Sequence, residues 1–111
     1  MVIEYIRYRI DAGRSDEFER AYAKAVSSLA ASPNCLTYQV ARGVEEPESY
    51  IVRIEWDSVE GHEQGFRRSP EFRDFFRAVK PFFDDIEEMR HYESLLDAAE
   101  TPRAAASAGS D

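Results

Sequence analysis

Three side chains of this sequence could do acid–base or hydrogen-bonding chemistry inside an apolar site: Glu4, Trp56 and His62. Glu4 shares one face of an alternating, mostly apolar segment. Burying its carboxylate there costs free energy unless a partner such as Arg90 meets it, and a carboxylate in such surroundings would suit a general base. The alternative is that Glu4 reaches water at the frayed start of a strand.

Trp56 and His62 each allow a functional and a structural interpretation. The indole N–H of Trp56 is a donor that a buried site must satisfy, unless the ring only packs in the core. His62 lies three residues after Val59 and four before Phe66, so a helix would place all three on one face. There His62 can act as a pocket base or remain a partly exposed structural histidine.

Further residues could line an apolar pocket for a planar aromatic ligand, in which tyrosine hydroxyls orient the ligand and other side chains supply apolar surface. Simple packing in the core is the alternative for each. The candidates are Tyr8, Tyr22, Tyr38, Val52, Phe66 and Phe76.

The sequence spacing indicates no metal site and no cofactor. His62 and His91 are the only histidines, and no paired carboxylates flank them at ligand spacing. His91 can equally line a seam between subunits. The lone Cys35 excludes an intramolecular disulfide and a cysteine zinc cluster, which favours the cytoplasm.

The composition describes one acidic domain. The 111 residues carry a formal net charge of −8, which repels nucleic acid and anionic lipid surfaces. Glu4, Arg7 and Arg9 interrupt the apolar N-terminal stretch, so we expect neither a signal peptide nor a membrane span there.

The periodicity predicts the elements that must position these residues. Apolar residues alternate in four segments, and apolar stripes of helical spacing occupy the two long intervals between them. Ser15 or Asp16 can cap the first helix, and Ser69 followed by Pro70 can start the last one. We expect strands over 2–10, 35–42, 50–56 and 86–92, and a helix over about 15–32. In the second interval, Ser58 can cap a short helix that carries Val59, His62 and Phe66, and the helix that restarts at Ser69-Pro70 ends at Pro81.

This order is the α+β, ferredoxin-like βαββαβ plan with a four-stranded antiparallel sheet. The domain should span residues 1–96. Residues 97–111 form a small-residue, polar tail whose composition offers no packing stripe, so we expect the domain to fold without it.

Three stretches of the chain resemble the antibiotic-biosynthesis monooxygenase family. CLTYQVARGVEEPESYIVRIEWDS, from Cys35 to Ser58, is similar to the family's hairpin with its acidic turn and closing "EWDS". GFRRSPEFRDFF looks like its second helix, and RYRIDAGRSDEFE looks like its first strand and helix start. The resemblance covers residues 1–93.

The resemblance implies a dimeric α+β barrel, in which the sheets of two protomers face each other. The residues agree with this, because Ile3, Tyr5 and Ile51 are too apolar for a solvated outer sheet face. We therefore expect a homodimer with one pocket in each protomer, between sheet and helices.

The family resemblance also implies cofactor-free oxidation of a small phenolic, anthrone or quinol-type aromatic by dioxygen. Such chemistry needs an apolar pocket, a proton acceptor and donors for the developing oxyanion, and Trp56 with His62 would orient the aromatic and stabilise that oxyanion. Two positions depart from the family pattern: Phe66 stands at the usual histidine, and Val52 stands where a side-chain amide is favoured.

Two alternatives follow from the same resemblance. Residues 2–10 lack the asparagine of haem-degrading relatives, and a phenyl ring at Phe66 or Phe76 cannot ligate iron, so haem degradation is disfavoured. The other alternative to an oxygenase is a dimer that binds a small molecule without turnover.

Overall fold

The computed structural model describes residues 1–96, so the predicted tail over 97–111 lies outside the described residues. Four strands form one antiparallel sheet in the spatial order β2-β3-β1-β4. This topology confirms the predicted βαββαβ plan. The strands are β1 (Val2–Arg9), β2 (Cys35–Arg42), β3 (Ser49–Trp56) and β4 (Ile86–Glu93).

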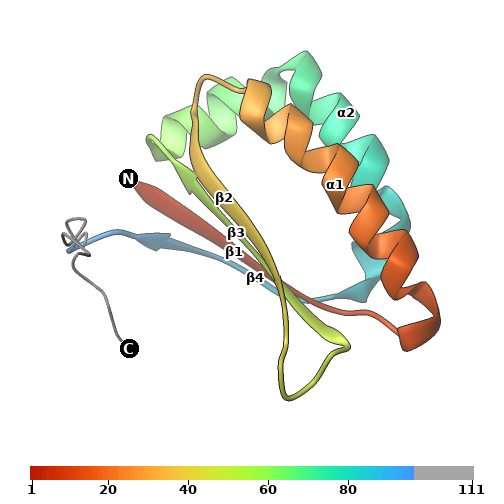
Figure 1. The fold of residues 1–111 in the computed structure, drawn as a ribbon. Coiled ribbons are helices and arrows are strands. Elements are labelled where there is room, and N and C mark those ends of the chain that lie inside the picture. Colours follow the sequence, from red (N-terminus) through yellow and green to blue (C-terminus); the bar gives the residue numbers. More distant parts are fainter. Residues whose placement is uncertain (97–111) are drawn as a thin grey trace, which may run out of the picture.

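Two helices, α1 (Ser15–Ala31) and α2 (Pro70–Val79), lie side by side over one face of this sheet, as Figure 1 shows. Helix α1 buries the stripe that its sequence predicts, with Phe18, Tyr22 and Leu29 each at most 1% exposed. Packing of this stripe on the sheet contributes more to the helix than intrinsic propensity does.

The two helix starts differ from each other. Ser69 caps α2 as predicted, because its Oγ accepts the Phe72 N–H at 3.3 Å and Pro70 occupies the first helical position. The predicted cap of α1 is wrong. A 3₁₀ turn over Ala12–Arg14 precedes the helix, Arg14 takes the cap position, and the Ser15 hydroxyl donates to the Ala12 carbonyl oxygen instead.

The segment between β3 and α2 is a succession of short turns. It contains a π-helical turn over Gly61–Gly65 and a 3₁₀ turn over Phe66–Arg68. The predicted helical stripe is wrong at Val59, whose side chain is exposed, while His62 and Phe66 are buried. The wider π turn breaks the three-residue spacing that would have kept Val59 on the same face.

The sheet face under the helices holds the core. Alternate residues of β1 and β3 are buried there, and Glu4 is among them at 7% exposure. The opposite face carries half-buried apolar residues such as Ile3 and Ile51 beside ion pairs such as Arg53–Glu55 at 2.7 Å. Within residues 1–96, no helix covers that face (Figure 1).

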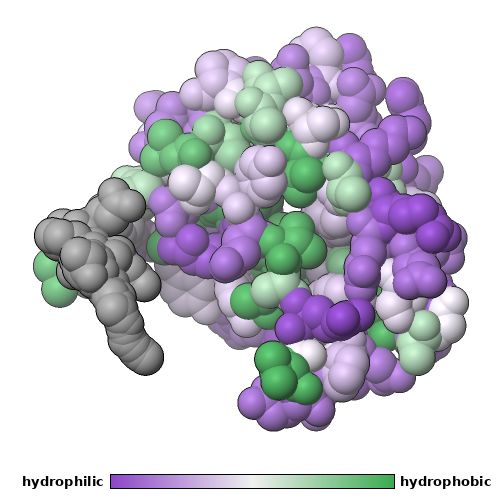
Figure 2. All heavy atoms as spheres, in the orientation of Figure 1, coloured by the Kyte–Doolittle hydropathy of each residue, from purple (hydrophilic) through white to green (hydrophobic). Residues whose placement is uncertain are grey.

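On the side of the molecule seen in Figure 2, hydrophobic and hydrophilic residues are intermingled. Among the described residues, no helix has both the length and the apolar composition needed to cross a membrane.

Candidate active site

Glu4 lies at the centre of a buried polar cluster. The Trp56 indole Nε1–H donates to Glu4 Oε1 at 3.1 Å, and His62 Nε2 lies 3.3 Å from the same oxygen. His91 Nε2 lies 3.9 Å from Glu4 Oε2. The structure therefore brings together the three predicted catalytic residues, of which Glu4 is far in the sequence from Trp56 and His62.

The prediction that Glu4 frays into water is wrong. Strand β1 is central in the sheet, and even Val2 is paired on both sides, so its start cannot fray freely. Arg90 is also not the partner of Glu4. It lies opposite Tyr5 in the β1–β4 register, so its side chain leaves from the other face of the sheet, where it pairs with Glu88.

His62 is held in place by the π-helical turn and by the ring of Trp56. The two rings stack at 4.8 Å with an interplanar angle of 28°. The turn approaches the loop before β2 so closely that a Cβ on Gly65 would lie 2.2 Å from Asn34 Oδ1. Any larger residue at that point of the turn would have to displace the Asn34 side chain.

The surroundings of His62 favour its neutral form. Burial lowers the pKa of the imidazole, the Glu4 carboxylate opposes this shift, and the neighbouring His91 and Arg67 lower it further. A neutral imidazole presents one nitrogen lone pair, which can accept a proton or bind a metal ion.

A cavity of about 210 Å³ opens beside this cluster, between the sheet and α2. The hydroxyl groups of Tyr8 and Tyr22 lie in its wall, 2.5 Å apart. Burial raises the pKa of Tyr8 to about 12, so both phenols are protonated at neutral pH. Most of the remaining wall consists of phenylalanine and aliphatic side chains, and Arg67 contributes a guanidinium group.

Six of the nine predicted site residues line this cavity: Glu4, Tyr8, Tyr22, His62, Phe66 and Phe76. Trp56 does not line it, because its ring lies behind Glu4 and His62 and its N–H is already bonded. The indole N–H is therefore placed to orient Glu4 instead of a substrate oxyanion.

The predictions of Tyr38 and Val52 as lining residues are wrong for this cavity. Val52 is fully buried in the middle of the sheet, paired with Ile6 and Val40. Tyr38 stands on the edge strand β2 and faces a different, open hollow beside α1. Alternation assigned both to the correct face, but only the helix positions decide which part of a face borders a cavity.

Sequence reasoning missed several wall residues, of which Arg67 is the most informative. Its guanidinium lies over the Phe72 ring, 5.3 Å from the centroid, and it borders the cavity beside Phe66. The charged pair in "GFRRSP" was the available signal, but sequence alone does not say which of Arg67 and Arg68 borders the cavity. Phe75 and Met89 were also missed as wall residues.

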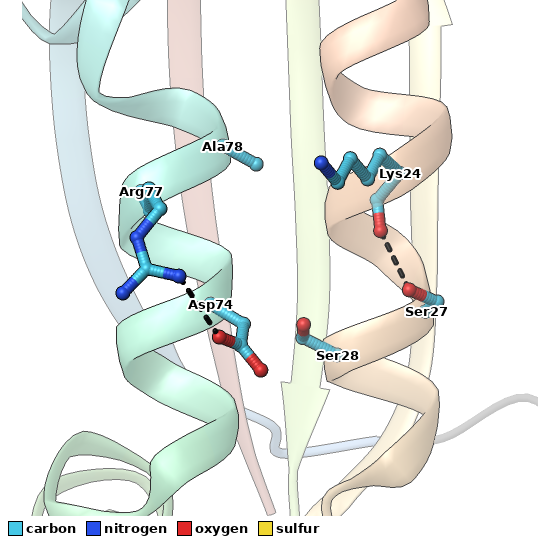
Figure 3. Close-up of a pocket in the computed structure, with 6 residues that line it drawn as sticks. All are labelled: Lys24, Ser27, Ser28, Asp74, Arg77 and Ala78. Atoms are coloured by element: carbon cyan, nitrogen blue, oxygen red, sulfur yellow. Dashed lines mark hydrogen bonds and ion pairs between the residues drawn. The ribbon is translucent and has the colours of Figure 1, made fainter.

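Another hollow, of about 250 Å³, lies between α1 and α2 (Figure 3). Two of its polar pairs bond within their own helices: Arg77 pairs with Asp74 at 3.5 Å, and the Ser27 hydroxyl donates to the Lys24 carbonyl at 2.6 Å. The wall contains no aromatic ring. We therefore place the candidate site at the cavity beside Glu4.

Solved structures with the same fold include proteins described as monooxygenases or oxygenases. A protein of Bordetella bronchiseptica assigned to the antibiotic biosynthesis monooxygenases superposes with a TM-score of 0.72 and 24% identity, covering 86% of this chain and 97% of its own. A variant of SnoaB, a cofactor-independent oxygenase of Streptomyces nogalater, has a TM-score of 0.74 and 16% identity, with coverages of 89% and 97%.

At the sequence level, the uncharacterized protein YczJ of Bacillus subtilis is 26% identical over 95 residues, which is 86% of this chain and all of YczJ. The family model for antibiotic biosynthesis monooxygenase matches residues 1–78. This match includes β1, α1, the β2–β3 hairpin, the π-helical turn and most of α2, and with them Glu4, Trp56 and His62. The chain belongs to the antibiotic biosynthesis monooxygenase family.

Proposed function

We propose that this protein oxidises a small phenolic, anthrone or quinol-type aromatic with dioxygen and needs no bound cofactor. The observation that carries the proposal is the buried Glu4–His62 contact at the wall of an aromatic cavity. Family membership supports a monooxygenase, and a cavity of about 210 Å³ suits a small aromatic.

His62 is the proposed general base. Its imidazole is held between the Trp56 ring and the Glu4 carboxylate, and it borders the cavity. When the imidazole takes a proton from the substrate, the carboxylate at 3.3 Å stabilises the resulting imidazolium. Trp56 is a positioning residue in this scheme, because its N–H fixes the carboxylate.

Arg67 and the Tyr8–Tyr22 pair are the proposed partners of the substrate oxygen. Loss of the proton leaves an anion, which the Arg67 guanidinium stabilises by charge. Both tyrosine hydroxyls are protonated, and one donates to the other, so the remaining O–H can donate to a carbonyl or phenol oxygen. Each of these groups lies in the wall of the same cavity.

The reaction balances without an external reductant. The substrate anion passes one electron to dioxygen, and the resulting radical and superoxide combine into a peroxide anion, which takes the proton back from His62 and becomes a hydroperoxide. Loss of water then leaves a new carbonyl. For an anthrone, one CH₂ group and one O₂ become one C=O group and one H₂O, whose two hydrogens are the proton returned by His62 and the remaining hydrogen of the CH₂ carbon.

The test is quinone formation in air-saturated buffer containing a chelator, with anthrone and the smaller 1-naphthol as substrates. We expect turnover above the buffer rate for the parent, and a loss of about tenfold to a thousandfold for His62→Gln. Arg67→Gln should lose rate, while Arg68→Gln, an equally exposed neighbour that does not line the cavity, is the matched control. Parent turnover at the buffer rate would refute the proposal, and binding without turnover would identify a ligand-binding protein.

We also propose that two protomers associate through their open sheet faces. Ile3, Tyr5 and Ile51 are half-buried on a face that no described helix covers. A specific association should bury more than roughly 1,000 Å². Sedimentation should give a dimer at micromolar concentration, and a monomer there would refute this.

The proposed location remains the cytoplasm, with which the free thiol of Cys35 is compatible.

A further inference from the structure

We propose that Glu4, His62 and His91 form a binding site for a divalent first-row transition-metal ion, such as Zn²⁺ or Fe²⁺. Each residue offers one donor atom, and the three donors lie within 4.8 Å of one another. The inference concerns one end of the cavity described above, but it does not rest on the proposed oxidation.

The fold brings the three donors together from separate segments. Glu4 and His91 are direct partners in the β1–β4 pairing, so their side chains leave the sheet from the same face. His62 approaches them from the π-helical turn, and its ring centroid lies 5.1 Å from that of His91. The donors therefore converge on one point beside the cavity.

The distances are close to those of a metal complex. Donors bound at 2.0–2.2 Å around a tetrahedral ion lie about 3.3 Å from each other. The His62 Nε2–Glu4 Oε1 distance is already 3.3 Å, and the His91 Nε2–Glu4 Oε2 distance is 3.9 Å. With one donor atom from each residue the separations reach up to 4.8 Å, and the side chain of His91, which is 45% exposed, has room to rotate toward the other two.

The donor types select the class of ion. Two imidazole nitrogens and one carboxylate suit Zn²⁺ or Fe²⁺, whereas Mg²⁺ and Ca²⁺ take oxygen donors. The Trp56 N–H bond to Glu4 supplies the outer hydrogen bond that orients a metal-binding carboxylate. His91 on the edge strand opens the site to solvent, and three protein ligands leave coordination positions free toward the cavity.

The experiment is a titration of tag-free, chelator-treated protein with Zn²⁺ by calorimetry and with Co²⁺ by absorption spectroscopy. We expect one ion per chain and an intense visible Co²⁺ spectrum typical of low coordination number. His91→Gln should weaken the affinity by at least about tenfold. Because His91 is largely exposed, this variant should fold, which circular dichroism can verify. Glu63→Gln, which removes an exposed carboxylate next to His62, is the matched control and should bind like the parent.

Equal affinity in the parent and His91→Gln would overturn the site, because the ion would then sit on surface carboxylates only. Absence of binding at millimolar metal would also overturn it. The oxidation assay contains chelator, so the two proposals fail separately. Turnover without metal binding would refute only the metal site, and metal binding without turnover would refute only the proposed oxidation.

Discussion

Replacing Trp56 by phenylalanine removes two contributions that this residue makes to stability, a buried hydrogen bond and ring packing. The indole is fully buried and donates to Glu4 Oε1 at 3.1 Å, and its ring packs against His62 and Phe66, each at 4.8 Å. Losing a hydrogen bond to a buried charged group costs about 1.5–3 kcal/mol. The smaller ring leaves a void that costs about 1–2 kcal/mol. Trp56→Phe should therefore destabilise the fold by about 2.5–5 kcal/mol.

A double-mutant cycle isolates the hydrogen bond. In a Glu4→Met background the acceptor is gone, so Trp56→Phe should cost only the packing contribution of about 1–2 kcal/mol. The coupling free energy should thus be about 1.5–3 kcal/mol. Urea unfolding followed by circular dichroism is the appropriate assay, because Trp56 is the only tryptophan and fluorescence would disappear with it. All four proteins should be measured at one chain concentration.

A second cycle provides the comparison. The Tyr50 hydroxyl donates to Glu19 Oε2 at 2.6 Å, but this carboxylate is 45% exposed. Water can replace the lost donor there, so the Tyr50–Glu19 coupling should stay below about 1 kcal/mol. A Trp56–Glu4 coupling below about 0.5 kcal/mol would refute the reasoning, because the buried carboxylate would then not depend on the indole.

Three further predictions follow from particular residues. The pKa of Tyr8 is raised to about 12 in the folded protein, so the unfolded chain loses this proton first as pH rises, and stability falls between about pH 10 and 12. Tyr8→Phe should flatten that fall in urea unfolding at stepped pH, and an unchanged slope would contradict the assignment. Gly65→Ala should cost about 1–2 kcal/mol, because the new methyl displaces Asn34 from its bond to Asp57, and a thermal melt matching the parent would contradict the close approach. A chain ending at Leu96 should melt within a few degrees of the full chain, and a larger loss would show that the tail contributes to the fold.

Local chemistry determined most of the fold. Strict alternation marked β1 and β3, and their register places the same residues on the face beneath the helices. The Ser69-Pro70 start of α2 was equally clear, because a cap and a first-turn proline act within four residues. The cap of α1 was predicted wrongly, because a 3₁₀ turn precedes the helix and places Arg14 at the cap position instead of Ser15 or Asp16.

The sequence by itself also identified the chemical groups of the site, since an acidic residue in an apolar strand, a lone tryptophan and a histidine near aromatic residues stand out by type. Only the tertiary structure decided their partners. Strand pairing places His91 opposite Glu4 and Arg90 on the other face of the sheet. The π-helical turn buries His62 and leaves Val59 exposed. Such contacts depend on register and on helix placement across long sequence separations, and no spacing within a single segment encodes them.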